Sequence, residues 1–181
     1  MTLYNVALRA LTHLPGTLLM VGASALETRL RGLAQKLKVA SRVIWNSRLT
    51  DAELAGAYHA ATALWLPSNA RSEAFGLVQV EAMASGCPVI NTDIPGSGVP
   101  WVSRHEETGL TVPMNDPDAL ADASRRLLKE TGLRERLVQC GRERAIAHFG
   151  HSTMASRSLE VYRECLDRAS DGTRRSRAAA A

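Results

Sequence analysis

Short apolar runs alternate with longer segments of helical periodicity along most of this 181-residue chain. Each apolar run ends at glycine, proline or a polar loop, which is typical of buried parallel strands. The segments between the runs repeat their apolar residues with the period of an amphipathic helix. This alternation predicts an α/β fold with a parallel sheet that is covered by helices on both faces.

The pattern gives bounds for each expected element. We expect strands at residues 17–21, 42–45, 62–66, 89–91 and 109–113. We expect helices at residues 2–13, 26–37, 50–58, 76–86, 116–129, 134–149 and 154–168. Thr50 and Glu53 form a capping-box pattern, and Asp116 followed by Pro117 is a typical helix start. Residues 1–169 are assigned to one domain, and residues 170–181 to a disordered tail rich in basic residues and alanine.

Composition narrows the function classes. Hydrophobic residues make up 45% of the chain and charged residues 22%, which is ordinary for a globular domain. Much of the net charge of +4 comes from Arg174, Arg175 and Arg177 in the tail. A basic tail of this kind is usually solvated, so no nucleic-acid partner is expected.

Cysteine usage and hydropathy indicate the compartment. No apolar run approaches the length of a membrane span, and no signal-peptide pattern opens the chain. The cysteines are widely spaced and lack a CxxC pair, which fits a reducing compartment: Cys87, Cys140 and Cys165. We therefore expect a cytoplasmic protein, and peripheral membrane contact is compatible with these features.

Four loops follow predicted strands at their carboxyl ends, where ligands of parallel sheets bind. They are residues 22–25, 46–49, 67–76 and 92–98. These loops predict one crevice along a single edge of the sheet.

The predicted helix at 76–86 is apolar on nearly every side, so it is expected to be buried. Glu81 would then lie among groups that solvate its charge poorly, and it would need hydrogen-bond donors. The two adjacent hydroxyls of a ribose can both donate to one carboxylate. Exposure to water, or an ion pair with an arginine, is the alternative interpretation of Glu81.

Glu73 lies in the polar loop just before this helix, where an exposed loop carboxylate is the ordinary interpretation. Its position makes it a candidate ligand-binding residue, because the helix start offers unpaired backbone N–H groups near Phe75, Gly76 and Leu77. Together with the positive end of the helix dipole they form an anion site suited to a phosphate. Phosphate at the helix start, ribose at Glu81 and a polar group at Glu73 describe a nucleoside diphosphate sugar.

The same segment carries a family resemblance. Residues 66–98 read L-P-S-N-A-R-S-E-A-F-G-L-V-Q-V-E-A-M-A-S-G-C-P-V-I-N-T-D-I-P-G-S-G. The pattern within it, E-x-F-G-L-x-x-x-E-A-M-A-x-G-x-P-V-I, is long and specific. It resembles the signature of glycosyltransferase family 4 (group 1), the retaining enzymes of the GT-B fold. Together with the later E-T-G-L-T-V-P-M-N-D-P, the resemblance covers roughly residues 11–168 and matches the Rossmann-like C-terminal, donor-binding domain.

The resemblance implies roles for individual residues. Glu81 matches the glutamate that holds the ribose hydroxyls, and Glu73 matches the one that contacts the donor sugar at the reacting centre. The backbone amides of Phe75, Gly76 and Leu77 would approach the sugar and phosphate. The loop at 46–49, including Arg48 and Leu49, would line the nucleobase. The implied activity is hexosyl transfer from a nucleoside diphosphate sugar to a glycan, lipid or small-molecule acceptor, with no metal or other cofactor.

The sequence also departs from that family pattern. The family has an N-terminal domain that binds the acceptor, and its donor domain begins with a strand and loop whose Arg and Lys neutralise the leaving phosphates. This sequence starts at about the following helix, so Arg48 and Arg71 are the candidates for part of that charge. We therefore expect a fragment with little activity alone, and a sheet with an unpaired position or exposed edge.

Two other functions fit the same residues. One is a non-catalytic, GT-B-derived binding or assembly module, in which the missing strand and domain are features of the gene product. An in-frame upstream extension that encodes a further α/β domain would favour the enzyme, and a stop codon would favour the module. The other is a nucleotide-sugar epimerase of similar fold, which would need its own catalytic carboxylates across the cleft.

Overall fold

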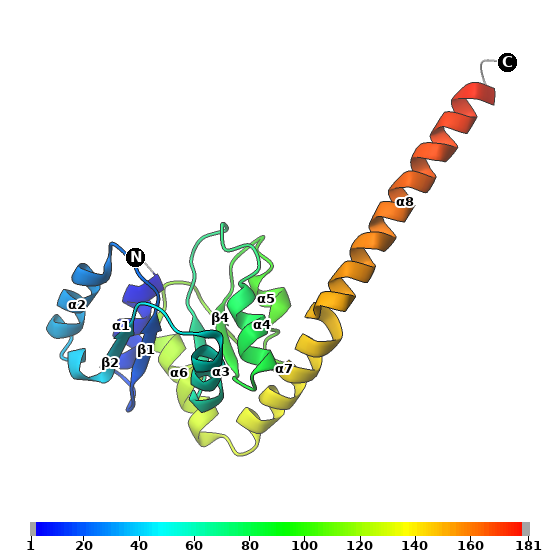
Figure 1. Cartoon of the computed structure of the whole chain (residues 1–181). Coiled ribbons are helices and arrows are strands. Elements are labelled where there is room, and N and C mark those ends of the chain that lie inside the picture. The colour runs from blue at the N-terminus through cyan, green and yellow to red at the C-terminus, as the bar shows by residue number, and fades with distance from the viewer. Residues whose placement is uncertain (1–2, 179–181) are drawn as a thin grey trace. The chain divides into compact units, whose positions relative to one another are not determined.

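The computed structural model describes residues 3–178 (Figure 1). It divides into two compact units, Met1–Ala145 and Ile146–Ala181. The first half of the first unit contains α1 (Leu3–Leu11), β1 (Leu18–Val21), α2 (Glu27–Lys36), η1 (Ala40–Arg42), β2 (Val43–Asn46) and α3 (Asp51–Ala60). Its second half contains β3 (Leu64–Leu66), α4 (Leu77–Ala84), β4 (Val89–Thr92), α5 (Val99–Val102), β5 (Gly109–Val112), α6 (Pro117–Lys129) and most of α7 (Leu133–Phe149).

The second unit contains the end of α7 and the long helix α8 (His151–Ala178). Helix α8 begins before the residues 154–168 expected for the last helix and continues through residues 170–178, which were expected to be disordered. Residues 179–181 of the expected tail lie outside the described part. No helix in the described part is long and apolar enough to cross a membrane.

Local signals set most boundaries where the sequence predicted them. Thr50 caps α3 in a complete capping box with Glu53. Asp116 caps α6, its side chain accepting from the Ala119 N–H, and Pro117 occupies the first turn. These contacts satisfy backbone N–H groups that a helix start would otherwise leave unpaired.

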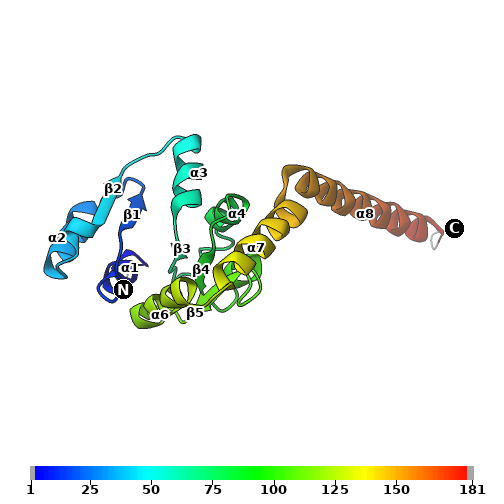
Figure 2. The same cartoon turned by 90° about the horizontal axis from the view of Figure 1, so that it is seen from below.

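All strand pairs are parallel, which confirms the α/β class, but the sheet is in two parts. β1 pairs with β2 from Leu18–Val43 to Val21–Asn46, while β3, β4 and β5 form a separate sheet in that order. Within residues 3–178, β1 has no strand on its other side and neither has β3. These strands are unpaired edges of the two sheets, and Figure 2 shows the two groups of strands apart.

Helix α1 packs on both groups of strands. Val6 and Ala10 enter the core formed by Ile90, Leu110 and helix α6. Leu8, on another side of α1, enters the smaller core between α2 and the β1–β2 sheet. One helix therefore joins two hydrophobic clusters that no strand pair connects.

The two sheets are covered differently. All four residues of β4 are buried, as expected for a strand with helices on both faces. In β1, residues alternate between half-buried and exposed, and Ile44 of β2 is 55% exposed. The expectation of cover on both faces therefore holds for β4 but not for the β1–β2 sheet, where the face that carries Leu19, Val21 and Ile44 is open.

Candidate functional site

The start of helix α4 is shaped by a glycine. Gly76 is the residue before the first helical position and has a left-handed backbone, φ 69° and ψ 68°. A Cβ at this position would lie 2.8 Å from the Leu66 Cδ2 atom and 3.0 Å from the Gln79 Nε2 atom. The left-handed backbone and the lack of space for a Cβ both require glycine here. Without a side chain, the backbone at the helix start is open to close approach by a ligand.

Backbone N–H groups at this helix start are unpaired. Gly76 provides no side-chain cap, and the Gln79 N–H donates to the Gly76 carbonyl over 2.9 Å. Among the described residues, no group accepts from the N–H of Leu77 or Val78. These two donors lie at the positive end of a helix dipole, where the sequence predicts an anion site.

Glu73 is held beside this helix start by its backbone. Its N–H donates to the Ala70 carbonyl over 3.0 Å, and its own carbonyl accepts from the Ser97 hydroxyl over 2.6 Å. The side chain is half-buried, and no group in the described part donates to its carboxylate. The carboxylate of Glu73 therefore has acceptor positions that a bound molecule could use.

Two of the predicted crevice loops, 67–76 and 92–98, are in contact. The Gly98 N–H donates to the Ala74 carbonyl over 2.8 Å, and a Cβ on Gly98 would lie 2.7 Å from that oxygen. The Arg71 guanidinium rests against Gly96, whose added Cβ would lie 2.9 Å from an Nη atom. Arg71 thus packs across the two loops, and they form one wall of the site.

A buried amide pair, missed from the sequence, supports this wall from below. The Asn91 Nδ2 atom donates to the Gln79 Oε1 atom over 2.8 Å and to the carbonyls of Ser103 and Val99 over 2.9 and 3.2 Å. The Gln79 Nε2 atom in turn donates to the Phe75 carbonyl over 3.0 Å. Both amides are fully buried. The sequence signal that could have revealed this pair is Gln79 within a mostly apolar helix and Asn91 at the end of an apolar strand.

The structure corrects the environment of Glu81. Helix α4 buries Gln79, Ala82 and Met83, but Leu77 is 68% exposed and Glu81 itself is exposed. The expectation that α4 is buried all round was wrong, because its short apolar stretch does not determine which sides neighbouring elements cover. A poorly solvated charge is therefore not the reason for a ligand at Glu81.

Glu81 nevertheless has a specific partner that the sequence did not indicate. The Tyr58 hydroxyl of α3 donates to the Glu81 Oε2 atom over 3.2 Å. Burial, and then the negative charge of Glu81, raise the pKa of Tyr58 well above its ordinary value, so its hydroxyl remains a donor. A carboxylate has about four acceptor positions, so Glu81 can accept from further hydroxyls on its open side.

An aromatic pair lies beside the helix start. The rings of Phe75 and Trp101 have their centroids 6.3 Å apart. Arg144 lies over the Trp101 ring at 5.2 Å and donates to the carbonyls of Trp101 and Val102. Trp101 is therefore part of the surface next to Phe75.

The loop predicted to line the nucleobase lies at the carboxyl end of β2. The Arg48 N–H donates to the Asn46 Oδ1 atom over 3.1 Å, while Arg48 is exposed and Leu49 half-buried. In the described part, no hydrogen bond or ion pair joins Arg48 or Leu49 to residues 68–81. The structure thus connects Glu73 to Ser97 and Glu81 to Tyr58, but in the described part no such contact joins Arg48 or Leu49 to residues 68–81.

Comparison with known proteins gives consistent relatives. The chain is 35% identical to a D-inositol 3-phosphate glycosyltransferase of Xylanimonas cellulosilytica, over 91% of this chain and 40% of that protein. It is 39% identical to a phosphatidyl-myo-inositol mannosyltransferase of Mycobacterium leprae, over 80% of this chain and 37% of that protein. It therefore spans about two fifths of the length of these relatives.

A solved structure agrees in fold. The sucrose-phosphate synthase of Thermosynechococcus elongatus is similar over 91% of this chain and 42% of its own, with a TM-score of 0.80 and 34% identity. The sequence model of the family described as glycosyl transferases group 1 matches residues 4–144, which run from the first turn of α1 into α7. The chain belongs to the glycosyl transferases group 1 family.

Proposed function

We propose that this chain is the donor-binding part of a retaining glycosyltransferase that uses a nucleoside diphosphate sugar. The transfer would break the bond between the sugar C1 and the phosphate oxygen and join C1 to an acceptor hydroxyl oxygen, which gives up its proton. The chain spans about two fifths of the length of its relatives. We therefore propose the complete reaction, including the acceptor, for a protein that contains this chain.

The helix start of α4 is the observation that carries the proposal. Unpaired N–H groups on Leu77 and Val78 suit the diphosphate, and they lie four and five residues from the unsatisfied carboxylate of Glu73. Such donors stabilise charge that grows on the leaving phosphate as the bond breaks. Glu73 is assigned to a hydroxyl of the donor sugar, and no metal is assigned to the site.

Glu81 is assigned to the ribose. Its contact with the Tyr58 hydroxyl fixes one carboxylate oxygen, so the other is oriented before a ligand arrives. Arg48 and Leu49 are assigned to the nucleobase on the strength of the family resemblance. The three cysteines are all free thiols, which supports a cytoplasmic location.

Calorimetric titration of the chain with UDP-glucose and GDP-mannose tests the proposal. We expect at least one of them to bind, and Glu81→Ala to weaken it roughly tenfold to a hundredfold, because hydrogen bonds to a charged group are lost. Glu73→Gln should weaken sugar nucleotides more than the corresponding diphosphates, since its proposed contact is with the sugar.

Glu135→Ala is the matched control, since Glu135 is an exposed carboxylate on α7 without an ion pair among the described residues. The assignment of Glu81 is wrong if Glu81→Ala and Glu135→Ala both bind as tightly as the parent chain. Failure of both nucleotides to bind would instead favour the non-catalytic module.

A further inference from the structure

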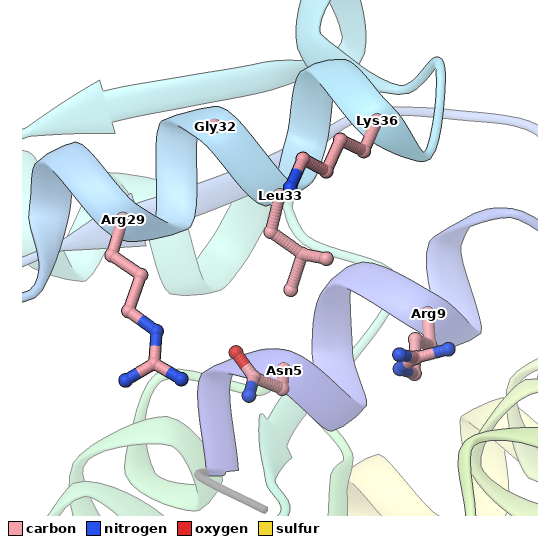
Figure 3. A pocket seen from close by; sticks show the side chains of 6 residues that line it. All are labelled: Asn5, Arg9, Arg29, Gly32, Leu33 and Lys36. Atoms are coloured by element: carbon pink, nitrogen blue, oxygen red, sulfur yellow. The ribbon is translucent and has the colours of Figure 1, made fainter.

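A groove runs between helices α1 and α2, and its lining is basic. Figure 3 shows its side chains, and its volume is about 460 Å³. The residues that line it are Asn5, Arg9, Arg29, Gly32, Leu33 and Lys36. Three of the six are cations and none is a carboxylate. The groove therefore has a positive electrostatic potential, which the low-dielectric walls formed by the two helices concentrate.

The three cations of the groove have no partner in the described part. No hydrogen bond or ion pair is made by the side chains of Arg9, Arg29 or Lys36. Nearby arginines behave differently: Arg31 pairs with Glu27 over 2.7 Å, and Arg42 donates to backbone carbonyls of the α1–β1 connection. The cations that have structural partners are thus different from those that face the groove.

Arg29 is in an unfavourable place for a cation. It lies in the first turn of α2, where the positive end of the helix dipole repels positive charge. Figure 3 shows it reaching toward Asn5 on α1, with Lys36 and Arg9 near the other end of the groove. A bound anion between them would remove both the repulsion by the dipole and that among the cations.

Gly32 keeps the groove open. A glycine inside a helix is destabilising relative to alanine. At Gly32 a Cβ would meet nothing within 4 Å, so packing in the described part does not require glycine there. Leu33 provides an apolar floor, since it also packs on the core beneath α2.

We propose that the α1–α2 groove is a second binding site, for a ligand that carries more than one phosphate group. Arginine forks bind phosphate through paired hydrogen bonds, and lysine adds a point charge. Arg29 and Lys36 are seven residues apart on one helix, which is roughly 10 Å along its axis. That spacing exceeds a single phosphate and suits two phosphate groups. The site is separate from the start of α4, where the proposed donor binds.

Calorimetric titration with inorganic tripolyphosphate tests the site. We expect binding that weakens steeply with salt, because phosphate contacts release counterions. The triple variant Arg9→Gln, Arg29→Gln, Lys36→Gln should bind roughly a hundredfold more weakly or worse, since each lost charge-assisted contact is worth about tenfold. All three side chains that change are at the surface, and thermal unfolding checks that the fold is kept.

Two further variants distinguish binding in the groove from a general effect of net charge. A second triple variant removes the same charge from exposed cations that have no ion pair in residues 3–168: Lys129→Gln, Arg142→Gln and Arg163→Gln. Gly32→Gln fills the groove without changing charge, and it should weaken binding at least tenfold while raising helix stability. Equal loss in the two triple variants, or full binding by Gly32→Gln, would overturn the site.

Vesicles distinguish the two sources of the phosphate. Sedimentation with phosphatidylcholine vesicles that contain phosphatidic acid would show a headgroup surface if the parent chain binds and the groove variant does not. Binding of tripolyphosphate alone would identify a free polyphosphorylated ligand. No binding in either assay would overturn the proposal, whereas titration with UDP-glucose tests the donor site independently.

Discussion

Strands β4 and β1 are parallel strands of one chain with opposite surroundings. β4 has a strand on each side and is buried on both faces. β1 has one neighbour, and alternate residues of it are exposed. The central strand of the β3–β5 sheet is thus buried by its own chain, whereas the β1–β2 sheet leaves a whole face open. Glu73 and the start of α4 follow strand β3 of the first of these sheets.

This difference indicates that the candidate site does not depend on the β1–β2 sheet. Its contacts run between α4, β4 and the loops 67–76 and 92–98. Only the loop at 46–49 belongs to the other sheet, and it has no hydrogen bond to residues 68–81 in the described part. An isolated chain should therefore keep the helix-start site even if its open sheet associates with another chain.

The largest expected effect compares two isoleucines. Ile90 of β4 is fully buried, and Ile44 of β2 is 55% exposed. Ile90→Ala should lower the free energy of unfolding by roughly 4 kcal/mol, because it leaves a cavity, and Ile44→Ala by less than about 1 kcal/mol. Urea unfolding followed by circular dichroism measures both, and equal losses would contradict the difference in cover.

The second comparison uses two asparagines that lie at the carboxyl ends of their strands. Asn91→Ala removes three buried hydrogen bonds and should cost roughly 3 kcal/mol, since the freed acceptors stay buried. Asn46→Ala loses one bond at the surface and should cost less than about 1 kcal/mol. A small effect at Asn91 would mean that water reaches the interior of the β3–β5 sheet.

A third effect is a pH dependence that comes from Cys87, which lies just before β4. Burial raises the pKa of the Cys87 thiol to about 11 from an ordinary value of 9.0. The folded chain therefore holds this proton more tightly than the unfolded chain, and stability that is present below pH 9 is lost as pH rises toward 11. The loss is on the order of 2 kcal/mol.

Urea unfolding between pH 8 and pH 11 measures this effect, with Cys87→Ala as the control. The stability advantage of the parent over Cys87→Ala should shrink as pH rises. A constant difference would show that the thiol is accessible to solvent in the folded chain.

The smallest effect concerns α3, which connects the two sheets in sequence. Thr50→Ala removes the helix cap and should cost about 1 kcal/mol, while Thr50→Ser should retain most of it. The backbone and side-chain hydrogen bonds of Thr50 lower the pKa of Glu53, so this contribution is present above the ordinary carboxyl pKa and lost as pH falls through the lowered one. Thermal unfolding at pH 7 and pH 3 would measure it, and equal effects at both would contradict the capping box.

Local chemistry determined much of the fold. The strand expected at 89–91 is β4 at Val89–Thr92, and the helix expected at 116–129 is α6 at Pro117–Lys129. Apolar periodicity, the Thr50–Glu53 box and the Asp116–Pro117 start act over a few residues, so they can be read directly from the chain. The glycine at position 76 and the loop that carries Glu73 were predictable for the same reason.

Tertiary structure alone decided the rest. The contact between Asn91 and Gln79 joins residues twelve positions apart, and the Tyr58–Glu81 contact joins α3 to α4. No periodicity indicates that α4 leaves Glu81 exposed or that the sheet divides between β1 and β3. The sequence determined which elements form, because helices and strands follow from neighbouring residues. Their packing determined which carboxylates are solvated and which strand edges stay open, because burial depends on elements that are distant in the chain.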